Sequence, residues 1–183
     1  MSYPDMPHFV DLCRGCARSI YGNTAPTPEY AERAARLLLG TAAVESAFQA
    51  RRQNGPMFSW HNIEGAWGLW QMEHGAAYDA LAFARNHPAV ERRAGEWLFC
   101  IPNADLSDFY GLLPSHLMHA LAWDRFACLM ARLYYLCKPP PIPAMECERA
   151  AYWKQHWNTE LGSGTAMRYM WTWNCFVEPY IGD

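Results

Sequence analysis

A single carboxylic acid, Glu45, stands on the apolar face of a predicted helix. Leu38, Ala42 and Glu45 are four and three residues apart, which places the carboxyl group on the side of the helix that faces the core. A carboxyl group among apolar neighbours loses hydration, so its pKa rises. A general acid needs such an environment to hold a proton near neutral pH. The alternative is that Glu45 turns to the helix edge and pairs with Arg36 or the Arg51-Arg52 pair.

A second segment with chemical potential spans residues 65–72 and reads Gly-Ala-Trp-Gly-Leu-Trp-Gln-Met. Its two glycines permit a tight turn and let the backbone approach a bulky ligand closely. Gln71 offers both a donor and an acceptor, which suits the hydroxyl and N-acetyl groups of sugars. Three indoles are candidates for a stacking wall, or alternatively for a buried aromatic cluster: Trp60, Trp67 and Trp70.

Together these segments resemble the hallmark motifs of soluble lytic transglycosylases and goose-type lysozymes. The family pattern is a Glu-Ser pair ending an internal helix, here Glu45-Ser46, followed by Gly-x-x-Gly-Leu-x-Gln, here residues 65–71. Residues 131–136 are similar to the family's Tyr-Leu helix. Residues 150–159 are similar to its Ala-Tyr-Asn-Ala-Gly segment, with Trp157-Asn158 in place of Tyr-Asn. The matches follow the family's order over residues 28 to 165.

The resemblance implies a mainly α, lysozyme-like single domain with a cleft around the helix that carries Glu45. It also implies that Glu45 protonates the glycosidic oxygen of a MurNAc–GlcNAc β-1,4 linkage. In a transglycosylase the MurNAc 6-hydroxyl then attacks its own anomeric carbon and gives a 1,6-anhydro product, without any cofactor or metal. The residues that the resemblance assigns to substrate binding are Ser46, Gly68, Leu69, Gln71, Tyr134, Trp157 and Asn158.

A hydrolase needs a second carboxylate, about 5–9.5 Å from the first depending on stereochemistry. Glu73, Glu64 and Asp79 are the candidates nearest in sequence. Glu73 directly follows Gln71-Met72, although a surface or helix-capping role is the alternative. Because no second acid stands out, the sequence favours a single-acid transglycosylase over a two-carboxylate hydrolase.

The spacing of apolar residues predicts the helices that position these groups. Thr27 is the expected N-cap of the helix with Glu45, and prolines at positions 139–143 predict an extended connection. We expect one domain over residues 27–183, preceded by an N-terminal arm over residues 1–26. The expected helices cover residues 28 to about 53, 68–85, 90–99, 115–137, 146–157 and 166–176.

Composition narrows the class of protein. The chain has 183 residues, of which 51% are hydrophobic and 15% aromatic, enough to form a core without metal or disulfide. Its formal net charge of −3 and scattered basic residues argue against a nucleic-acid partner. Seven cysteines, an odd number, indicate reduced thiols. His116 and His119 share a helix face but lack a third metal ligand. We expect neither a signal peptide nor a membrane span.

The compartment poses a further question, because a wall-cleaving enzyme without a signal peptide needs another route to the wall. Residues 37–46 and 153–165 are similar to small lysozyme-like proteins of bacteriophages. The expectation is therefore synthesis in the bacterial cytoplasm, then release at lysis as an endolysin or incorporation in the virion. Expected partners are the peptidoglycan strand and other virion proteins. The alternatives are a structural tail or core protein that keeps the fold with little turnover, and an enzyme that cleaves chitin or another polysaccharide.

Overall fold

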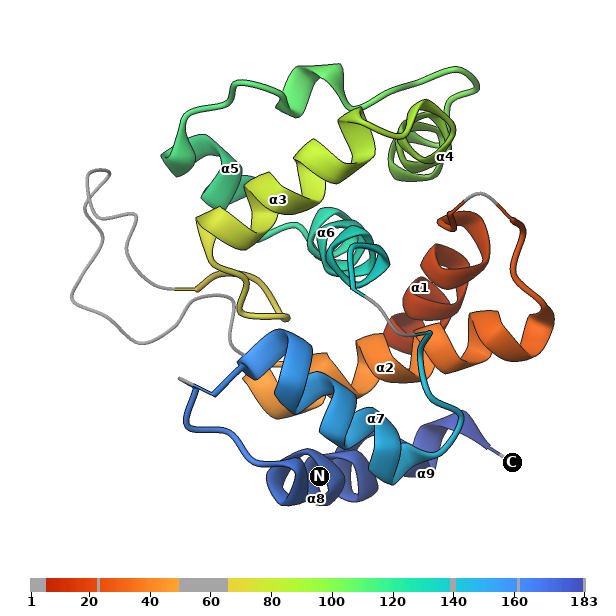
Figure 1. Ribbon diagram of the computed structural model, residues 1–183, viewed down its shortest axis with the longest axis vertical. Helices are drawn as coiled ribbons and strands as arrows, with labels where there is room; N and C mark the ends of the chain where they lie inside the picture. Colours follow the sequence, from red (N-terminus) through yellow and green to blue (C-terminus); the bar gives the residue numbers. More distant parts are fainter. Residues whose placement is uncertain (1–5, 23, 50–65, 139–140, 161, 183) are drawn as a thin grey trace.

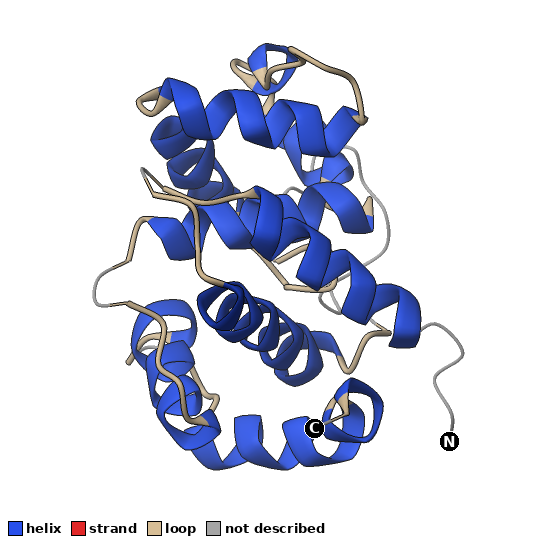
Figure 2. Ribbon diagram, turned by 90° about the vertical axis from the view of Figure 1, so that its right-hand side faces the viewer, coloured by secondary structure: helices blue, strands red, loops and turns tan. Residues whose placement is uncertain are grey.

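The computed structural model describes residues 6–22, 24–49, 66–138, 141–160 and 162–182, and within them every regular element is a helix (Figures 1 and 2). The prediction of a mainly helical chain is therefore confirmed. None of the described helices is long and apolar enough to cross a membrane. The elements are α1 (Met6–Ser19), α2 (Pro28–Ser46), α3 (His74–Arg85), α4 (Pro88–Phe99), the short 3-10 helix η1 (Ser107–Phe109), α5 (Pro114–Ala120), α6 (Asp124–Leu136), α7 (Glu146–Trp153), the π-helical turn η2 (Lys154–Asn158), α8 (Ala166–Phe176) and α9 (Glu178–Ile181).

Helix α6 lies at the centre of the molecule and joins two groups of helices (Figure 1). It packs against α3 and α4 in the upper half of the view, and against α1 and α2 in the lower half. Helix α2 packs in turn on α1 and α8. The apolar face predicted for α2 is confirmed, because Leu38 and Ala42 are fully buried. Met130 and Leu133 on α6 are fully buried as well.

Helix α2 begins where the sequence predicts but ends earlier. The Thr27 hydroxyl accepts a hydrogen bond of 3.3 Å from the Tyr30 backbone amide, which confirms the N-cap. The predicted end near residue 53 is wrong, because Ala47 and Phe48 adopt left-handed backbone conformations with φ of 48° and 58°. Phe48 thereby turns inward and stacks on Phe9 of α1, with 5.4 Å between ring centroids. Residues 50–53 lie outside the described part of the chain.

The predicted helix over residues 68–85 begins only at His74, because residues 67–72 form a tight turn instead. Trp67 and Met72 exchange two backbone hydrogen bonds of 3.0 and 2.9 Å. We call residues 66–73 the Trp-Gln turn. Gly68 has φ of 73°, and a Cβ atom there would lie 2.4 Å from the Leu121 carbonyl oxygen. The turn expected from the glycines is therefore present, pressed against the chain between α5 and α6.

The long helix predicted over residues 115–137 is two helices, α5 and α6. The backbone amides of Ala122 and Trp123 bond to carbonyls three residues back, which closes a turn after α5. The break occurs without glycine or proline, at the place where the Leu121 carbonyl meets Gly68. Tertiary packing, and not local propensity, therefore divides this segment.

The remaining helices largely agree with the predicted ranges. Helix α4 covers the range expected to begin at residue 90, and α8 matches its expected bounds. The range 146–157 is covered by α7 and the π-helical turn η2. Within the expected N-terminal arm, residues 6–19 form α1, which packs on α2 and α6 and buries Met6 and Cys13 completely. The domain boundary at residue 27 stays a prediction.

Candidate functional site

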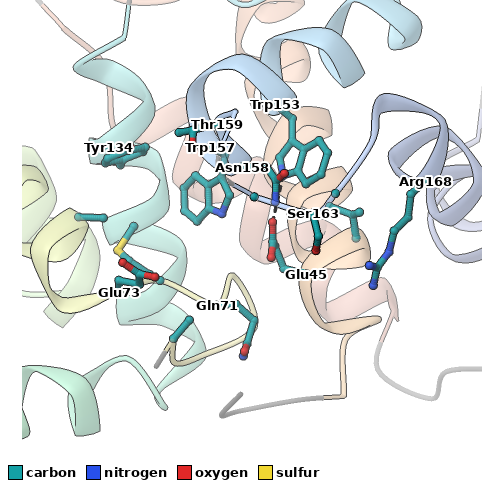
Figure 3. Close-up of a pocket in the computed structure, with 16 residues that line it drawn as sticks. Glu45, Gln71, Glu73, Tyr134, Trp153, Trp157, Asn158, Thr159, Ser163 and Arg168 are labelled. Carbon is teal, nitrogen blue, oxygen red and sulfur yellow. Dashed lines mark hydrogen bonds between the residues drawn. The ribbon is translucent and has the colours of Figure 1, made fainter. Parts of the chain in front are cut away.

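A cavity of about 660 Å³ opens beside the C-terminal end of α2 (Figure 3). Its walls come from α2, the Trp-Gln turn, α6, the junction of α7 and η2, the loop before α8, and α8 itself. Segments distant in the sequence thus meet around one space. The residues that line it are Val44, Glu45, Ala66, Gln71, Met72, Glu73, Ala76, Tyr134, Trp153, Trp157, Asn158, Thr159, Gly162, Ser163, Gly164 and Arg168.

Glu45 occupies the last turn of α2 and reaches the cavity (Figure 3). Burial raises the pKa of its carboxyl group to about 7, against a hydrogen bond from Trp153 and the positive charge of Arg168, which both lower it. The negative end of the α2 dipole also disfavours a charged carboxylate at this position. Of the arginines weighed as partners, Arg36 pairs with Glu32 instead, at 3.5 Å, and Arg51 and Arg52 lie outside the described residues. Glu45 is therefore set to exchange a proton near neutral pH.

Trp153 holds the Glu45 carboxyl group in place. Its indole Nε1 donates a hydrogen bond of 3.2 Å to Glu45 Oε1. The Trp153 ring is itself buried and packs against Gly164, where a Cβ atom would lie 2.5 Å from the ring. It also lies beside Tyr169 of α8, with 5.6 Å between ring centroids. The acid is thus oriented by a side chain that has little room to move.

Lys154 ties the π-helical turn η2 to the loop before α8. Its ammonium group donates to Asn158 Oδ1 at 2.8 Å, to the Thr159 carbonyl at 2.6 Å and to the Gly162 carbonyl at 2.8 Å. A Cβ atom at Gly162 would lie 2.2 Å from the Asn158 carbonyl oxygen, so this loop needs glycine to approach η2. π-helical turns occur frequently at functional sites. Here the turn brings Trp157 and Asn158 to the cavity wall.

Of the two alternatives for the tryptophans of residues 60–70, the structure supports the buried cluster for Trp67 and Trp70. Trp67 and Trp70 are buried, and the Trp70 indole donates to the Leu38 carbonyl at 2.9 Å, so these rings belong to the core. Trp60 lies outside the described residues. The aromatic side chains at the cavity are instead Trp157 and Tyr134, whose rings meet edge to face with centroids 5.2 Å apart, together with Trp153.

Of the predicted binding residues, Gln71, Tyr134, Trp157 and Asn158 line the cavity with Glu45. Gln71 has φ of 47°, and its side-chain amide donates to the Gly68 carbonyl at 2.7 Å. The tertiary structure therefore brings together residues from four separate segments of the sequence.

The other three predicted binding residues do not line the cavity. The Ser46 hydroxyl donates to the Ala42 carbonyl of its own helix, at 3.0 Å. Leu69 is fully buried in the core. Gly68 serves the fold, because its positive φ and its contact with Leu121 shape the Trp-Gln turn. These three residues belong to the helix end and the turn that carry the lining residues Glu45 and Gln71.

The three candidates for a second carboxylate differ in their position relative to the cavity. Glu73 lines the cavity but is exposed at the start of α3, on the opposite side of Glu45 from Arg168 in Figure 3. Its side chain makes no capping hydrogen bond to α3. Asp79 is exposed on α3 and does not line the cavity, and Glu64 lies outside the described residues. Glu45 is half-buried and Glu73 is exposed, so Glu45 is the less exposed of the two acids among the described lining residues.

Sequence reasoning missed three contributors to the site: Trp153 as the partner of Glu45, Ser163 and Arg168. Thr165 caps α8, because its hydroxyl accepts a hydrogen bond of 3.1 Å from the Arg168 amide. Arg168 carries no motif, and only the packing of α8 on α2 brings it to the cavity. That packing requires Gly40, where a Cβ atom would lie 2.0 Å from the Tyr169 hydroxyl oxygen.

We expect Trp153→Phe to raise the pKa of Glu45 further, by up to about one unit. The indole N–H stabilises the ionised carboxylate, and a hydrogen bond worth about 1 kcal/mol corresponds to somewhat less than one pKa unit. The measurement is an NMR titration of the labelled Glu45 carboxyl carbon in both proteins. Trp171→Phe on the exposed face of α8 is the control and should leave the titration unchanged. An equal or lower pKa in Trp153→Phe contradicts the assigned role of the indole.

The cavity thus combines a proton donor near neutrality, an aromatic wall, amide groups and one exposed cation. Among the described residues, no group of three or more His, Cys, Asp or Glu side chains is placed to hold a metal ion. Comparisons of the chain with protein-family models, with curated proteins and with solved structures found no match. Its chemistry is therefore inferred from the residues at the site.

Proposed function

We propose that this protein is a peptidoglycan lytic transglycosylase with a lysozyme-like fold, in which Glu45 cleaves the MurNAc–GlcNAc β-1,4 linkage. The observation that carries the proposal is the Glu45 carboxyl group, with its pKa raised to about 7 at the wall of an open cavity. A carboxylic acid that is still protonated near pH 7 is what a glycosidic oxygen needs as a proton donor. The resemblance of residues 45–46 and 65–71 to the transglycosylase motifs supports the same reaction.

The proposed reaction uses one residue in two roles. Protonated Glu45 donates its proton to the glycosidic oxygen, the bond from that oxygen to the MurNAc anomeric carbon breaks, and the GlcNAc unit leaves with a new 4-hydroxyl group. The MurNAc 6-hydroxyl then attacks the anomeric carbon and returns its proton to the Glu45 carboxylate. The products are a 1,6-anhydro end and a free GlcNAc end, and the acid is regenerated without water.

The carboxyl groups around the cavity support a single-acid mechanism. Glu45 and Glu73 are the only acidic side chains among the described lining residues, and Glu73 is exposed. The Trp157 and Tyr134 rings suit stacking on sugar faces, and Asn158 offers an amide for a sugar hydroxyl. Delivery to the wall from a phage particle or at host lysis belongs to this proposal.

The test is product analysis of purified peptidoglycan digested with the protein. We expect soluble muropeptides that end in 1,6-anhydro-MurNAc, each lighter by one water molecule than the corresponding reducing-end product, as measured by mass spectrometry. Reducing-end products, together with loss of turnover in Glu73→Gln, would establish a two-carboxylate hydrolase instead. Absence of any cleavage by folded protein contradicts the enzymatic proposal and favours the structural virion protein.

A further inference from the structure

Arg168 is an exposed cation that lines the cavity. It lies in the first turn of α8, where its backbone amide bonds to the Thr165 hydroxyl at 3.1 Å. The next residue, Tyr169, is fully buried against Gly40 of α2, which fixes the register of α8 on α2. The Arg168 side chain is exposed and lines the same cavity as Glu45 (Figure 3).

Within the described part of the chain, Arg168 takes part in none of the ion pairs, although its charge acts on the Glu45 carboxyl group. The ion pairs within these ranges involve other arginines, namely Arg14, Arg36, Arg92 and Arg149. Arg168 is thus a charged side chain that lines the cavity without an ion-pair partner of its own. Its guanidinium group offers a planar fork of donors, which matches the geometry of a carboxylate.

The charge of Arg168 works against the acid function of Glu45 in the free protein. It lowers the pKa of Glu45 and so opposes retention of the proton that the acid must donate. Arg168 also lies in the first turn of α8, at the positive end of the helix dipole, where an anion is favoured over a cation. An anion bound beside Arg168 would offset both effects.

We propose that Arg168 binds a carboxylate of the substrate strand and so selects anionic peptidoglycan over neutral GlcNAc polymers. This inference rests on the proposed function and names the chemical group of the substrate that the site recognises. Carboxylates in peptidoglycan come from the lactyl group of MurNAc or from the stem peptide attached to it, whereas chitin has none. The bound carboxylate neutralises Arg168, so that Glu45 holds its proton more firmly when the correct substrate is present.

The activity test compares wild type with Arg168→Gln and Arg168→Lys on three preparations. These are intact glycan strands, strands freed of peptide and thus carrying lactyl carboxylates, and strands whose carboxylates have been converted to amides with a carbodiimide. We expect kcat/KM of the wild type to fall about 10–100-fold on the amidated strands. Arg168→Gln should show the same loss on intact strands and no further loss on amidated ones, because both changes remove one interaction.

The controls separate this inference from a general effect of charge. Arg18→Gln removes an exposed cation of α1 that does not line the cavity and should keep the wild-type preference. Arg168→Lys keeps the charge without the fork and should retain part of the preference. Activity on peptide-free strands equal to that on intact strands assigns the lactyl carboxylate, and loss of activity there assigns the stem peptide. Equal losses for Arg168→Gln on intact and amidated strands overturn the inference and leave the proposed function standing.

A binding measurement tests the inference without turnover. Glu45→Gln should sediment with untreated insoluble peptidoglycan, and less with the amidated material. Glu45→Gln/Arg168→Gln should bind both materials equally weakly. If the wild type cleaves none of the substrates, the proposed function fails. The dependence of sedimentation on carboxylates still tests the binding role of Arg168 independently of turnover. Equal sedimentation of Glu45→Gln with untreated and amidated peptidoglycan overturns the inference.

Discussion

We expect Glu45→Gln to lower the proposed turnover of peptidoglycan by at least about 10²-fold, because it removes the only half-buried acid at the cavity among the described lining residues. Glutamine has nearly the same shape and still accepts a hydrogen bond from Trp153, so the geometry of the site is retained. What it lacks is a proton to give to the glycosidic oxygen. In the wild type, the rate should decline above pH 7 as Glu45 ionises, in line with its pKa of about 7.

The same substitution should stabilise the folded protein at alkaline pH. The pKa of Glu45 is raised from 4.5 to about 7 on folding, so between these values the folded state binds more protons than the unfolded one. Stability of the wild type therefore falls as pH rises through this window and stays lower above it. Glutamine does not ionise, so Glu45→Gln should be more stable at pH 8 by up to about 3 kcal/mol and little changed at pH 4.

Urea unfolding at pH 4 and pH 8, alongside initial rates of muropeptide release, measures both effects. Glu29→Gln, on the exposed first turn of the same helix, is the matched control. It should keep wild-type turnover and gain no stability at pH 8. Unchanged turnover in Glu45→Gln would exclude it as the acid, and a loss of stability at pH 8 would contradict the raised pKa.

Gly68→Ala should destabilise the protein by about 2–4 kcal/mol, because it combines a steric clash with an unfavourable backbone conformation. An alanine would have to adopt φ of 73°, and its Cβ atom would lie 2.4 Å from the Leu121 carbonyl oxygen. Neither backbone segment moves easily, because the turn is closed by the Trp67–Met72 hydrogen bonds. The Trp-Gln turn would shift and carry Gln71 with it, so turnover should fall as well.

Gly75→Ala is the control for this substitution. Gly75 lies in the first turn of α3, where a Cβ atom would meet nothing within 4 Å. Alanine there should stabilise the protein by about 0.4–1 kcal/mol through its lower conformational entropy when unfolded. In thermal unfolding experiments, Gly68→Ala should therefore have a Tm lower than that of the wild type by roughly 4–16 °C. The Tm of Gly75→Ala should be slightly higher than that of the wild type. A Gly68→Ala protein as stable as the wild type contradicts the close approach at Leu121.

The sequence was sufficient wherever a local pattern dictates structure. The apolar spacing along residues 31–45 predicted the buried face of α2 and the position of Glu45 on it. Thr27 identified the start of α2. The two glycines of residues 65–68 indicated a tight turn. These features follow from helical periodicity, capping and backbone freedom, which depend on near neighbours in the chain.

Other features depended on contacts between distant segments, and the sequence misjudged them. The end of α2 at Ser46 follows from the burial of Phe48 against Phe9, and the break between α5 and α6 coincides with the approach of Gly68 to Leu121. Neither break lies at a glycine or proline, so the local sequence does not predict it. Packing likewise decides which tryptophans lie in the core and which line the cavity. The position of a tryptophan in the sequence is compatible with either location.

For the proposed acid, the sequence by itself determined that a carboxyl group would stand on an apolar helix face. Only the tertiary structure decided what surrounds it: the Trp153 indole that orients it, the cavity that exposes it, and the Arg168 charge beside it. Periodicity fixes the direction of a side chain relative to its own helix. The pKa depends on burial, on a hydrogen bond from α7 and on a charge from α8, both more than a hundred residues away along the chain.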